Sequence, residues 1–362
     1  MKRRFIPHTS MLLTLVTTLF VFGLASPVAQ AAQQIPHTST RTVTIMTRNM
    51  DSATDFGLVL GATTVQQFEV GATATYQEVQ ASNIPERAQA IASEIRATHP
   101  DLVGLQEVGL WRTGPFGQPP ATTVQFDSLQ SLLDALKQQG LPYAPVAIMN
   151  EFDLEGPSSL GFDVRYTDRD VILARTGDDA PELSNIQEQH YATNLTFPTV
   201  FGPVTATRGW ESVDVNIRGR SFRFVTTHLE TYSASVQVAQ SNELLQVPGN
   251  TSLPVVFAGD FNSAAGNGIP DQTPTYSNLI AAGLVDSWNV AHPSDPGYTW
   301  PLHGEDPYTS SSAPTERIDL VLFRGRFGTL GAQLIGNTTA DLTPSGLWPS
   351  DHAGVVATLQ LP

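Results

Sequence analysis

The sequence has no cysteine, only two lysines and a single long apolar run. Without cysteine, this chain of 362 residues has no disulfide framework, no thiolate metal site and no cysteine nucleophile. Because the lysines are Lys2 and Lys137 alone, contacts to phosphate would fall to arginine, which binds phosphate oxygens in pairs. The formal net charge of −15 argues against coating nucleic acid through a broad basic face. It does not exclude an enzyme that approaches phosphate through a metal ion.

The apolar run lies near the N-terminus, from Met11 to Leu24. Three basic residues at positions 2–4 precede it, and the small-x-small sequence at 29–31 follows it, as in a cleavable secretory signal peptide. The alternative is a membrane anchor, but the run of 14 residues is shorter than the ~20 that a spanning helix needs. We therefore predict a signal peptide over 1–31, a short segment over 32–40, and an exported protein without a transmembrane anchor.

The rest of the chain has the composition of a folded domain, with 41% apolar and 15% charged residues. No linker or internal repeat divides it, so we predict one α/β domain over 41–362. Hairpin-joined strands outnumber helices, which favours two mixed sheets with helices outside over strict βαβ winding. Apolar patterns predict strands at 41–49, 101–108, 171–174, 213–217, 222–227, 254–259, 318–323 and 354–361, and helices at 85–98, 129–136, 234–245 and 276–282.

Residues 51–80 have weak periodicity and are predicted to be a loop or a decorated insertion, and residues 111–123 are predicted to be a loop. Residues 51–80 are rich in Gly, Ala, Thr and Gln, and residues 111–123 are rich in Gly and Pro. The second loop contains Trp111 and Phe116, which could dip into a lipid bilayer or could pack on the scaffold.

Polar residues follow the predicted strands at six places along the chain. In layered α/β proteins, side chains converge where strands stop. The polar set contains carboxylates, amides and imidazoles but no sulfur, which suits a hard divalent cation, with Mg²⁺ first and Mn²⁺ or Ca²⁺ next. The six motifs are TRNMD (47–51), LQE (105–107), THLE (227–230), GDFN (259–262), ERID (316–319) and SDH (350–352).

These motifs, in this order, resemble the endonuclease/exonuclease/phosphatase superfamily of DNases, abasic-site endonucleases, inositol phosphatases and sphingomyelinases. The resemblance implies a DNase-like, four-layered α-β-β-α sandwich of two mixed sheets and a metal-dependent phosphoesterase. It also implies that Glu107, Asn49 and Asp351 hold the metal. From the residues alone, Glu107 could instead pair with an arginine, and Asn49 could be a turn or cap residue.

The resemblance assigns the proton chemistry to His352, oriented by Asp319. A structural histidine is the alternative, but one within Ser-Asp-His and downstream of ERID favours catalysis. Asp260 would orient or deprotonate water, and Asn262 would bind phosphate or water. Residues two apart in an extended segment share a face, so both could point into the site while Phe261 packs away; the alternative is an Asx turn.

His228 would hydrogen-bond the phosphoryl oxygens or assist the leaving group. Taken together, the sequence predicts a secreted, extracellular or periplasmic, monomeric phosphoesterase without a stable protein partner. Its substrate would be a phosphodiester in nucleic acid or in a phospholipid headgroup. An endonuclease-like activity comes first, a sphingomyelinase-like enzyme or small-molecule phosphatase second, and a non-catalytic binding protein on the same fold last.

Overall fold

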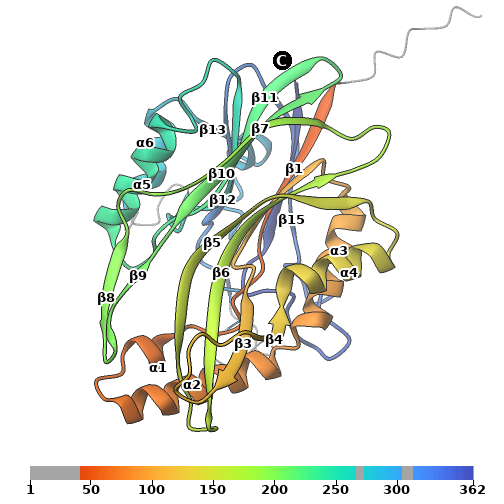
Figure 1. The fold of residues 1–362 in the computed structure, drawn as a ribbon. Helices are drawn as coiled ribbons and strands as arrows, with labels where there is room; N and C mark the ends of the chain where they lie inside the picture. Colours follow the sequence, from red (N-terminus) through yellow and green to blue (C-terminus); the bar gives the residue numbers. More distant parts are fainter. Residues whose placement is uncertain (1–40, 266–272, 304–312, 362) are drawn as a thin grey trace, which may run out of the picture. The chain divides into compact units, whose positions relative to one another are not determined.

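The computed structural model describes residues 41–265, 273–303 and 313–361, which all belong to one compact unit (Figure 1). The predicted signal peptide and the segment over 32–40 lie outside the described residues. Within the described ranges, no helix combines the length and apolar character needed to cross a membrane.

The first sheet has eight strands. Its mixed character comes from β1 and β2, which run parallel, whereas the other pairings are antiparallel. The strand order is β15 (Gly328–Ile335), β16 (Gly354–Gln360), β1 (Thr42–Asn49), β2 (Leu102–Gln106), β6 (Phe162–Arg175), β3 (Leu110–Pro115) and β4 (Thr123–Asp127), with β5 (Tyr143–Pro157) also paired to β6.

The second sheet has six strands, with β11 and β12 parallel and the rest antiparallel. The predicted hairpin joins β10 and β11 through Arg218 and Gly219, whose positive φ angles of 53° and 77° suit a tight hairpin turn. The order is β13 (Val285–Asp286), β14 (Asp319–Arg324), β12 (Val255–Asp260), β11 (Arg220–His228), β10 (Gly209–Ile217) and β7 (Glu182–His190). A separate hairpin contains β8 (Leu195–Thr199) and β9 (Gly202–Ala206).

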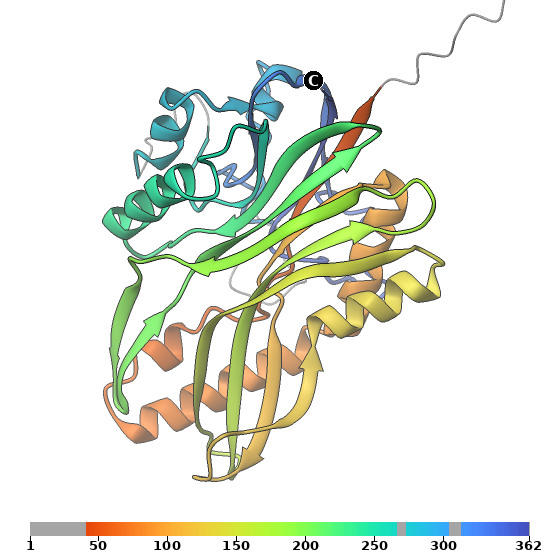
Figure 2. The same cartoon turned by 45° about the horizontal axis from the view of Figure 1, so that its top comes forward.

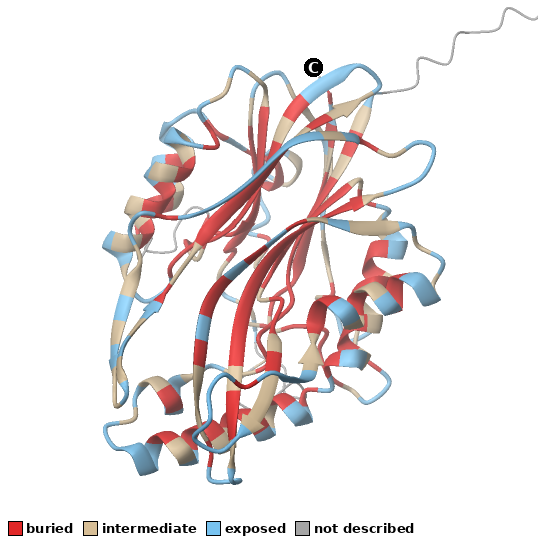
Figure 3. Ribbon diagram, in the orientation of Figure 1, coloured by how far each residue is buried: buried red, intermediate tan, exposed pale blue. Residues whose placement is uncertain are grey.

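The two sheets face each other across a shared apolar core, because alternate side chains of each strand point inward. Ile45 of β1 and Phe224 of β11 belong to this core. Gly104 of β2 allows the two sheets to approach each other closely, since a Cβ there would lie 2.4 Å from the hydroxyl oxygen of Thr226 on β11. Buried strands therefore occupy the middle of the unit (Figure 3).

Helices cover the two outer faces and complete the predicted α-β-β-α sandwich (Figure 2). Met46 and Leu105 of the first sheet pack against Ile91 and Leu132 of the helices on that side. The second sheet packs in the same way against helices on its own outer face. The first sheet carries α3 (Ile84–Thr98) and α4 (Ser128–Gln138), and the second carries α5 (Ala234–Gln246) and α6 (Thr275–Ala281), with the short α7 (Ser287–Ala291) beside β14 and β15.

For residues 51–80, the prediction of a loop was wrong, and the segment is a helical insertion. This segment contains α1 (Gly57–Leu60) and the 17-residue α2 (Val65–Ala81), which Thr64 caps by accepting a hydrogen bond from the Gln67 amide. The buried face of α2 includes Ala72 and Thr75, whose small side chains weaken the apolar periodicity. Ala, Gln and Glu nevertheless favour a helix, and tertiary packing supplies the rest.

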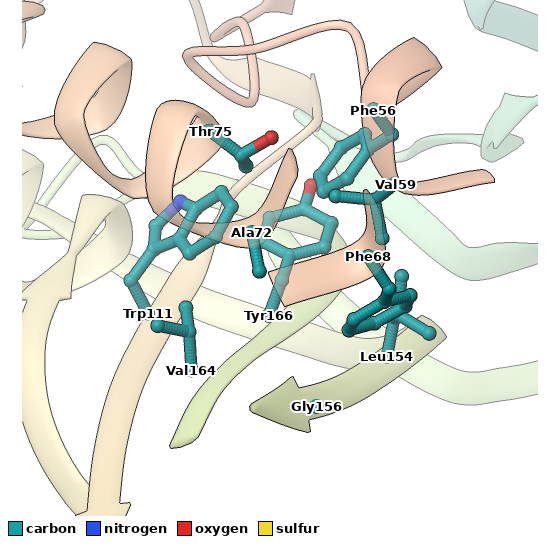
Figure 4. Close-up of a pocket in the computed structure, with 10 residues that line it drawn as sticks. All are labelled: Phe56, Val59, Phe68, Ala72, Thr75, Trp111, Leu154, Gly156, Val164 and Tyr166. Atoms are coloured by element: carbon teal, nitrogen blue, oxygen red, sulfur yellow. The ribbon is translucent and has the colours of Figure 1, made fainter. Parts of the chain in front are cut away.

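The prediction of a loop over 111–123 was also wrong at both ends of the segment, where β3 and β4 form an antiparallel pair. Trp111 is 1% exposed and its ring centroid lies 4.6 Å from that of Tyr166, so it cannot dip into a bilayer. Figure 4 shows these two rings in the wall of an apolar pocket between α1, α2 and the first sheet. The lining has no charged residue, so the pocket is no candidate for binding phosphate.

Three carboxylates interrupt the core between the sheets. Glu151, Asp170 and Glu211 are at most 4% exposed, and their carboxylate oxygens have no hydrogen-bond partner among the described residues. Burial raises the pKa of each well above its usual value, with added repulsion from Asp170 on Glu151 and Glu211, and from Asp168 on Asp170. The folded state therefore retains protons that the unfolded chain releases above pH ~4, so these groups cost stability as the pH rises.

We predict that Glu211→Gln raises the free energy of unfolding by about 1–3 kcal/mol at pH 8, on the scale of an unsatisfied buried group. The gain should disappear at about pH 3, where the carboxyl is protonated in both states. Urea unfolding at the two pH values measures it, with the exposed Glu182→Gln as the matched control. A loss of stability at pH 8 would contradict the prediction.

Candidate active site

Strand register places three of the predicted catalytic residues in one row. His228 at the end of β11 pairs with Asp260 at the end of β12, which pairs with Asp319 at the start of β14. Paired residues on neighbouring strands direct their side chains to the same face. All three residues are at most 2% exposed.

His352 joins this row from the segment before β16. Its Nδ1 lies 2.8 Å from Asp319 Oδ2, and its backbone carbonyl accepts a hydrogen bond from Arg48. Burial alone would lower the pKa of His352, but Asp319 and Asp351 raise it well above its ordinary value. Because Asp319 accepts the Nδ1 proton, Nε2 is the atom that faces the site.

The Asp260 carboxylate lies at the centre of the site. Its Oδ2 is 3.6 Å from His228 Nε2 and 3.8 Å from His352 Nε2, and it accepts a hydrogen bond of 3.2 Å from Asn49 Nδ2. Burial and the negative charge of Asp319 raise the pKa of Asp260 to about 7. A carboxyl group that titrates near neutrality can both accept and return a proton.

Asn49 connects this row to Glu107 on the other sheet. The same Asn49 amide nitrogen donates to Glu107 Oε1 at 2.8 Å, while its carbonyl oxygen accepts from the Asp51 amide. The other oxygen of Glu107 accepts from both the amide and the hydroxyl of Ser52, at 2.8 and 2.6 Å. In this arrangement Asn49 and Ser52 orient the Glu107 carboxylate.

Two groups of side chains are close enough to share a cation: Glu107 with His228 and Asp260, and Asp260 with Asp319 and His352. The structure thus places His228 and Asp260 beside Glu107, with Asp260 as the second carboxylate ligand, whereas the sequence grouped Glu107 with Asn49 and Asp351. Strand pairing explains the difference, because His228 and Asp260 lie directly beside each other. Carboxylate oxygens of Glu107 and Asp260 are ligands that suit a hard cation, so the residues fit a divalent metal.

A chain of polar residues behind His228 has no counterpart in the sequence motifs. Arg208 Nη1 lies 2.6 Å from His228 Nδ1 and 3.1 Å from Asp168 Oδ2, and Asp168 accepts a hydrogen bond from Tyr166. Arginine only donates, so His228 Nδ1 accepts and its Nε2 carries the proton. Burial and the positive charge of Arg208 lower the pKa of His228 well below its usual value, which makes it a neutral N–H donor.

Asp351 lies at the edge of the site, where its Oδ2 is 3.8 Å from His352 Nε2 and accepts from Trp300 Nε1 at 3.2 Å. Burial and the nearby Asp51 raise the pKa of Asp351 to about 6. Burial opposes ionisation of Asp51 as well, yet Arg87 lowers its pKa to about 2. His303, for which the sequence indicates no site role, has its Nε2 3.8 Å from Asp51 Oδ2.

Asn262 lies on the loop after β12 with a positive φ of 48°, and Phe261 packs away into the outer core as predicted. The side-chain nitrogen Nδ2 of Asn262 donates to the Leu229 carbonyl at 2.9 Å. The backbone amide of Asn262 donates to Asp260 Oδ1 at the same distance. The Asx-turn alternative therefore describes part of its role. Direct contact with phosphate stays a prediction.

Sequence comparison shows the family to which this chain belongs. The model of the Endonuclease/Exonuclease/phosphatase family matches residues 77–352, which is more than half of the chain. The chain belongs to the endonuclease/exonuclease/phosphatase family. It is therefore a phosphoric ester hydrolase, as its motifs predicted.

Relatives and structural neighbours agree with this membership. Tyrosyl-DNA phosphodiesterase 2 of Rattus norvegicus is 28% identical over 155 residues, which covers 41% of this chain and 40% of that protein. A family protein from Leptotrichia buccalis C-1013-b superposes with a TM-score of 0.57 at 16% identity, covering 88% of this chain and 99% of the other. A mannosyl-6-phosphatase from Bacteroides thetaiotaomicron VPI-5482 gives 0.55 at 15% identity, with the same two coverages. These two structures support the fold alone.

Proposed function

We propose that this chain is a secreted phosphodiesterase that requires a divalent cation, Mg²⁺ first, and cleaves phosphodiester bonds in nucleic acid. The observation that supports the chemistry best is the Asp319–His352 pair at 2.8 Å, with the free imidazole nitrogen directed at Asp260. This pair can move a proton, and the neighbouring carboxylates suit a cation.

Hydrolysis needs a positioned water, neutralised phosphoryl oxygens and a stabilised leaving oxygen. A cation held by Glu107 and Asp260 would polarise the phosphoryl group and offset its negative charge. Asp319 keeps the Nδ1 proton of His352 in place, so Nε2 exchanges a proton with the attacking water or the leaving oxygen. The N–H of His228 donates to a phosphoryl oxygen, where negative charge grows in the transition state.

The nucleic-acid substrate is supported by the relative named tyrosyl-DNA phosphodiesterase 2, although the match spans only 40% of that protein. The lipid alternative loses one of its two apolar anchors, since Trp111 is buried. The proposed secretion rests on the N-terminal sequence alone.

A panel of substrates in Mg²⁺ tests the proposal. We expect turnover of bis(p-nitrophenyl) phosphate and cleavage of plasmid DNA or a tyrosyl-DNA conjugate, in preference to RNA, sphingomyelin and phosphomonoesters. Release of phosphocholine from sphingomyelin with the DNA intact would contradict the substrate class. Absence of turnover on every substrate would favour a non-catalytic binding protein.

A further inference from the structure

Tyr232 is an exposed aromatic residue on the loop between β11 and α5. Its side chain is 64% exposed, the largest fraction among the exposed large hydrophobic residues that the structure describes. It lies four residues after the catalytic-site residue His228. An exposed ring of this size beside an active site calls for a physical reason.

The loop that carries Tyr232 is fixed to the catalytic row. Leu229 donates its amide to the Asp260 carbonyl at 3.0 Å and accepts from the Asn262 side chain. Gln237 of α5 donates to the carbonyls of both Glu230 and Asn262 at 2.7 Å. The backbone leading to Tyr232 is therefore positioned by the same hydrogen bonds that hold the GDFN loop.

The ring of Tyr232 is held as well. Its backbone amide donates to Glu230 Oε1 at 2.7 Å, and its ring meets that of Phe197 edge to face, with centroids 5.7 Å apart. Phe197 lies on β8, in the hairpin that reaches α1, and packs against the apolar cluster of the 51–80 insertion (Figure 1). One aromatic contact thus fixes the ring while most of it stays exposed.

The ring of Tyr232 also lies near charged residues of the site. The Tyr232 phenol lies within electrostatic reach of Glu107 on the first sheet, of Asp55 on the loop before α1 and of Arg208 behind His228. Glu107 and Arg208 belong to the candidate site, so the exposed ring lies at its border. A flat group attached to a phosphoryl centre there would meet the open part of the ring.

We propose that Tyr232 is a stacking platform for a planar substituent of the phosphoester, namely a nucleobase. A ring fixed in advance loses little entropy on binding, and every base has a face that can stack on it. This inference rests on the proposed phosphodiesterase function and names the group that the substrate carries beside the cleaved bond.

Two esters with one leaving group measure the effect: thymidine 5′-(p-nitrophenyl phosphate) and methyl p-nitrophenyl phosphate. In Tyr232→Ala, we expect the ratio of the nucleosidyl KM to the methyl KM to rise about 10-fold, within the range of a lost stacking contact. Tyr232→Leu should behave like the alanine variant, and Tyr232→Phe like the wild type. Phe116→Ala, at an exposed aromatic residue on the β3–β4 turn, should leave both KM values unchanged.

Binding of thymidine 5′-monophosphate in Mg²⁺, measured by calorimetry, separates failure of this proposal from failure of the proposed function. Weaker binding by Tyr232→Ala than by the wild type, at equal urea stability, supports the platform even if neither ester is hydrolysed. Equal affinity for the nucleotide, or an unchanged KM ratio, would overturn it. A Tyr232-dependent loss of binding to phosphatidylcholine vesicles with an unchanged nucleotide affinity would also overturn it, in favour of a membrane contact.

Discussion

Removal of divalent cations with EDTA is expected to abolish phosphodiester hydrolysis, and added Mg²⁺ or Mn²⁺ is expected to restore it. Glu107, Asp260 and Asp319 bring three carboxylates to the mouth between the sheets, and no lysine lies among the site residues to neutralise a phosphoryl group there. A bound cation would supply that neutralisation. The initial rate on bis(p-nitrophenyl) phosphate across a metal titration measures the effect.

Glu107→Gln removes one carboxylate charge and should raise the Mg²⁺ concentration for half-maximal rate by at least ~10-fold, on the scale of changes around metal ligands. The exposed Glu182→Gln keeps the same chemical change away from the site and should match the wild type. A Mg²⁺-dependent rise in Tm that is lost in Glu107→Gln would report binding without relying on activity. Full activity in EDTA would exclude the cation from the mechanism.

Much of the site could be predicted from the sequence because its residues lie at strand ends. Asn49, Glu107, His228 and Asp260 each follow a short run of β-branched or apolar residues, and strand ends meet at one edge of a layered α/β fold. The same local patterns identified α3, α4 and α5. In these places the local sequence and the tertiary fold favour the same structure.

The remaining parts depend on contacts between distant residues. Arg208 lies in no motif, and its role appears only when β10 and β11 place it beside His228. Tyr166 and Asp168 are two apart on β6 and share a face, a pattern that was available in the sequence but is common in strands. Their significance comes from Ser52, more than a hundred residues away, whose hydroxyl lies 2.8 Å from that of Tyr166.

The helices of the 51–80 insertion were missed for a related reason. The α2 face is completed by Trp111 and Leu154, which belong to strands of the first sheet. Burial against those residues, rather than the periodicity of the helix itself, determines which side chains of α2 lie inside. A local stretch of sequence contains no information about the sheet residues against which its helix packs.

Replacing His352 by alanine is expected to lower kcat by at least ~10²-fold while leaving the fold intact, which is the usual scale for losing an acid–base group. In the proposed mechanism the imidazole contributes its Nε2 to the reaction, and its removal also leaves the buried Asp319 carboxylate without its cationic partner. Single-turnover rates on bis(p-nitrophenyl) phosphate measure the loss. His190→Ala, at an exposed histidine of β7, is the matched control and should keep the wild-type rate.

The Asp319→Asn variant distinguishes proton transfer from mere packing at His352. Asp319 is the nearest carboxylate that raises the pKa of His352, so the protonated imidazole persists to higher pH in the wild type. With the amide in its place, the pKa should fall, because burial then acts without the opposing charge. We therefore expect the limb of the kcat–pH profile that reports His352 to move to lower pH, with a smaller loss of rate than in His352→Ala. An unshifted profile, or a near-wild-type rate in His352→Ala, would remove this pair from the chemical step.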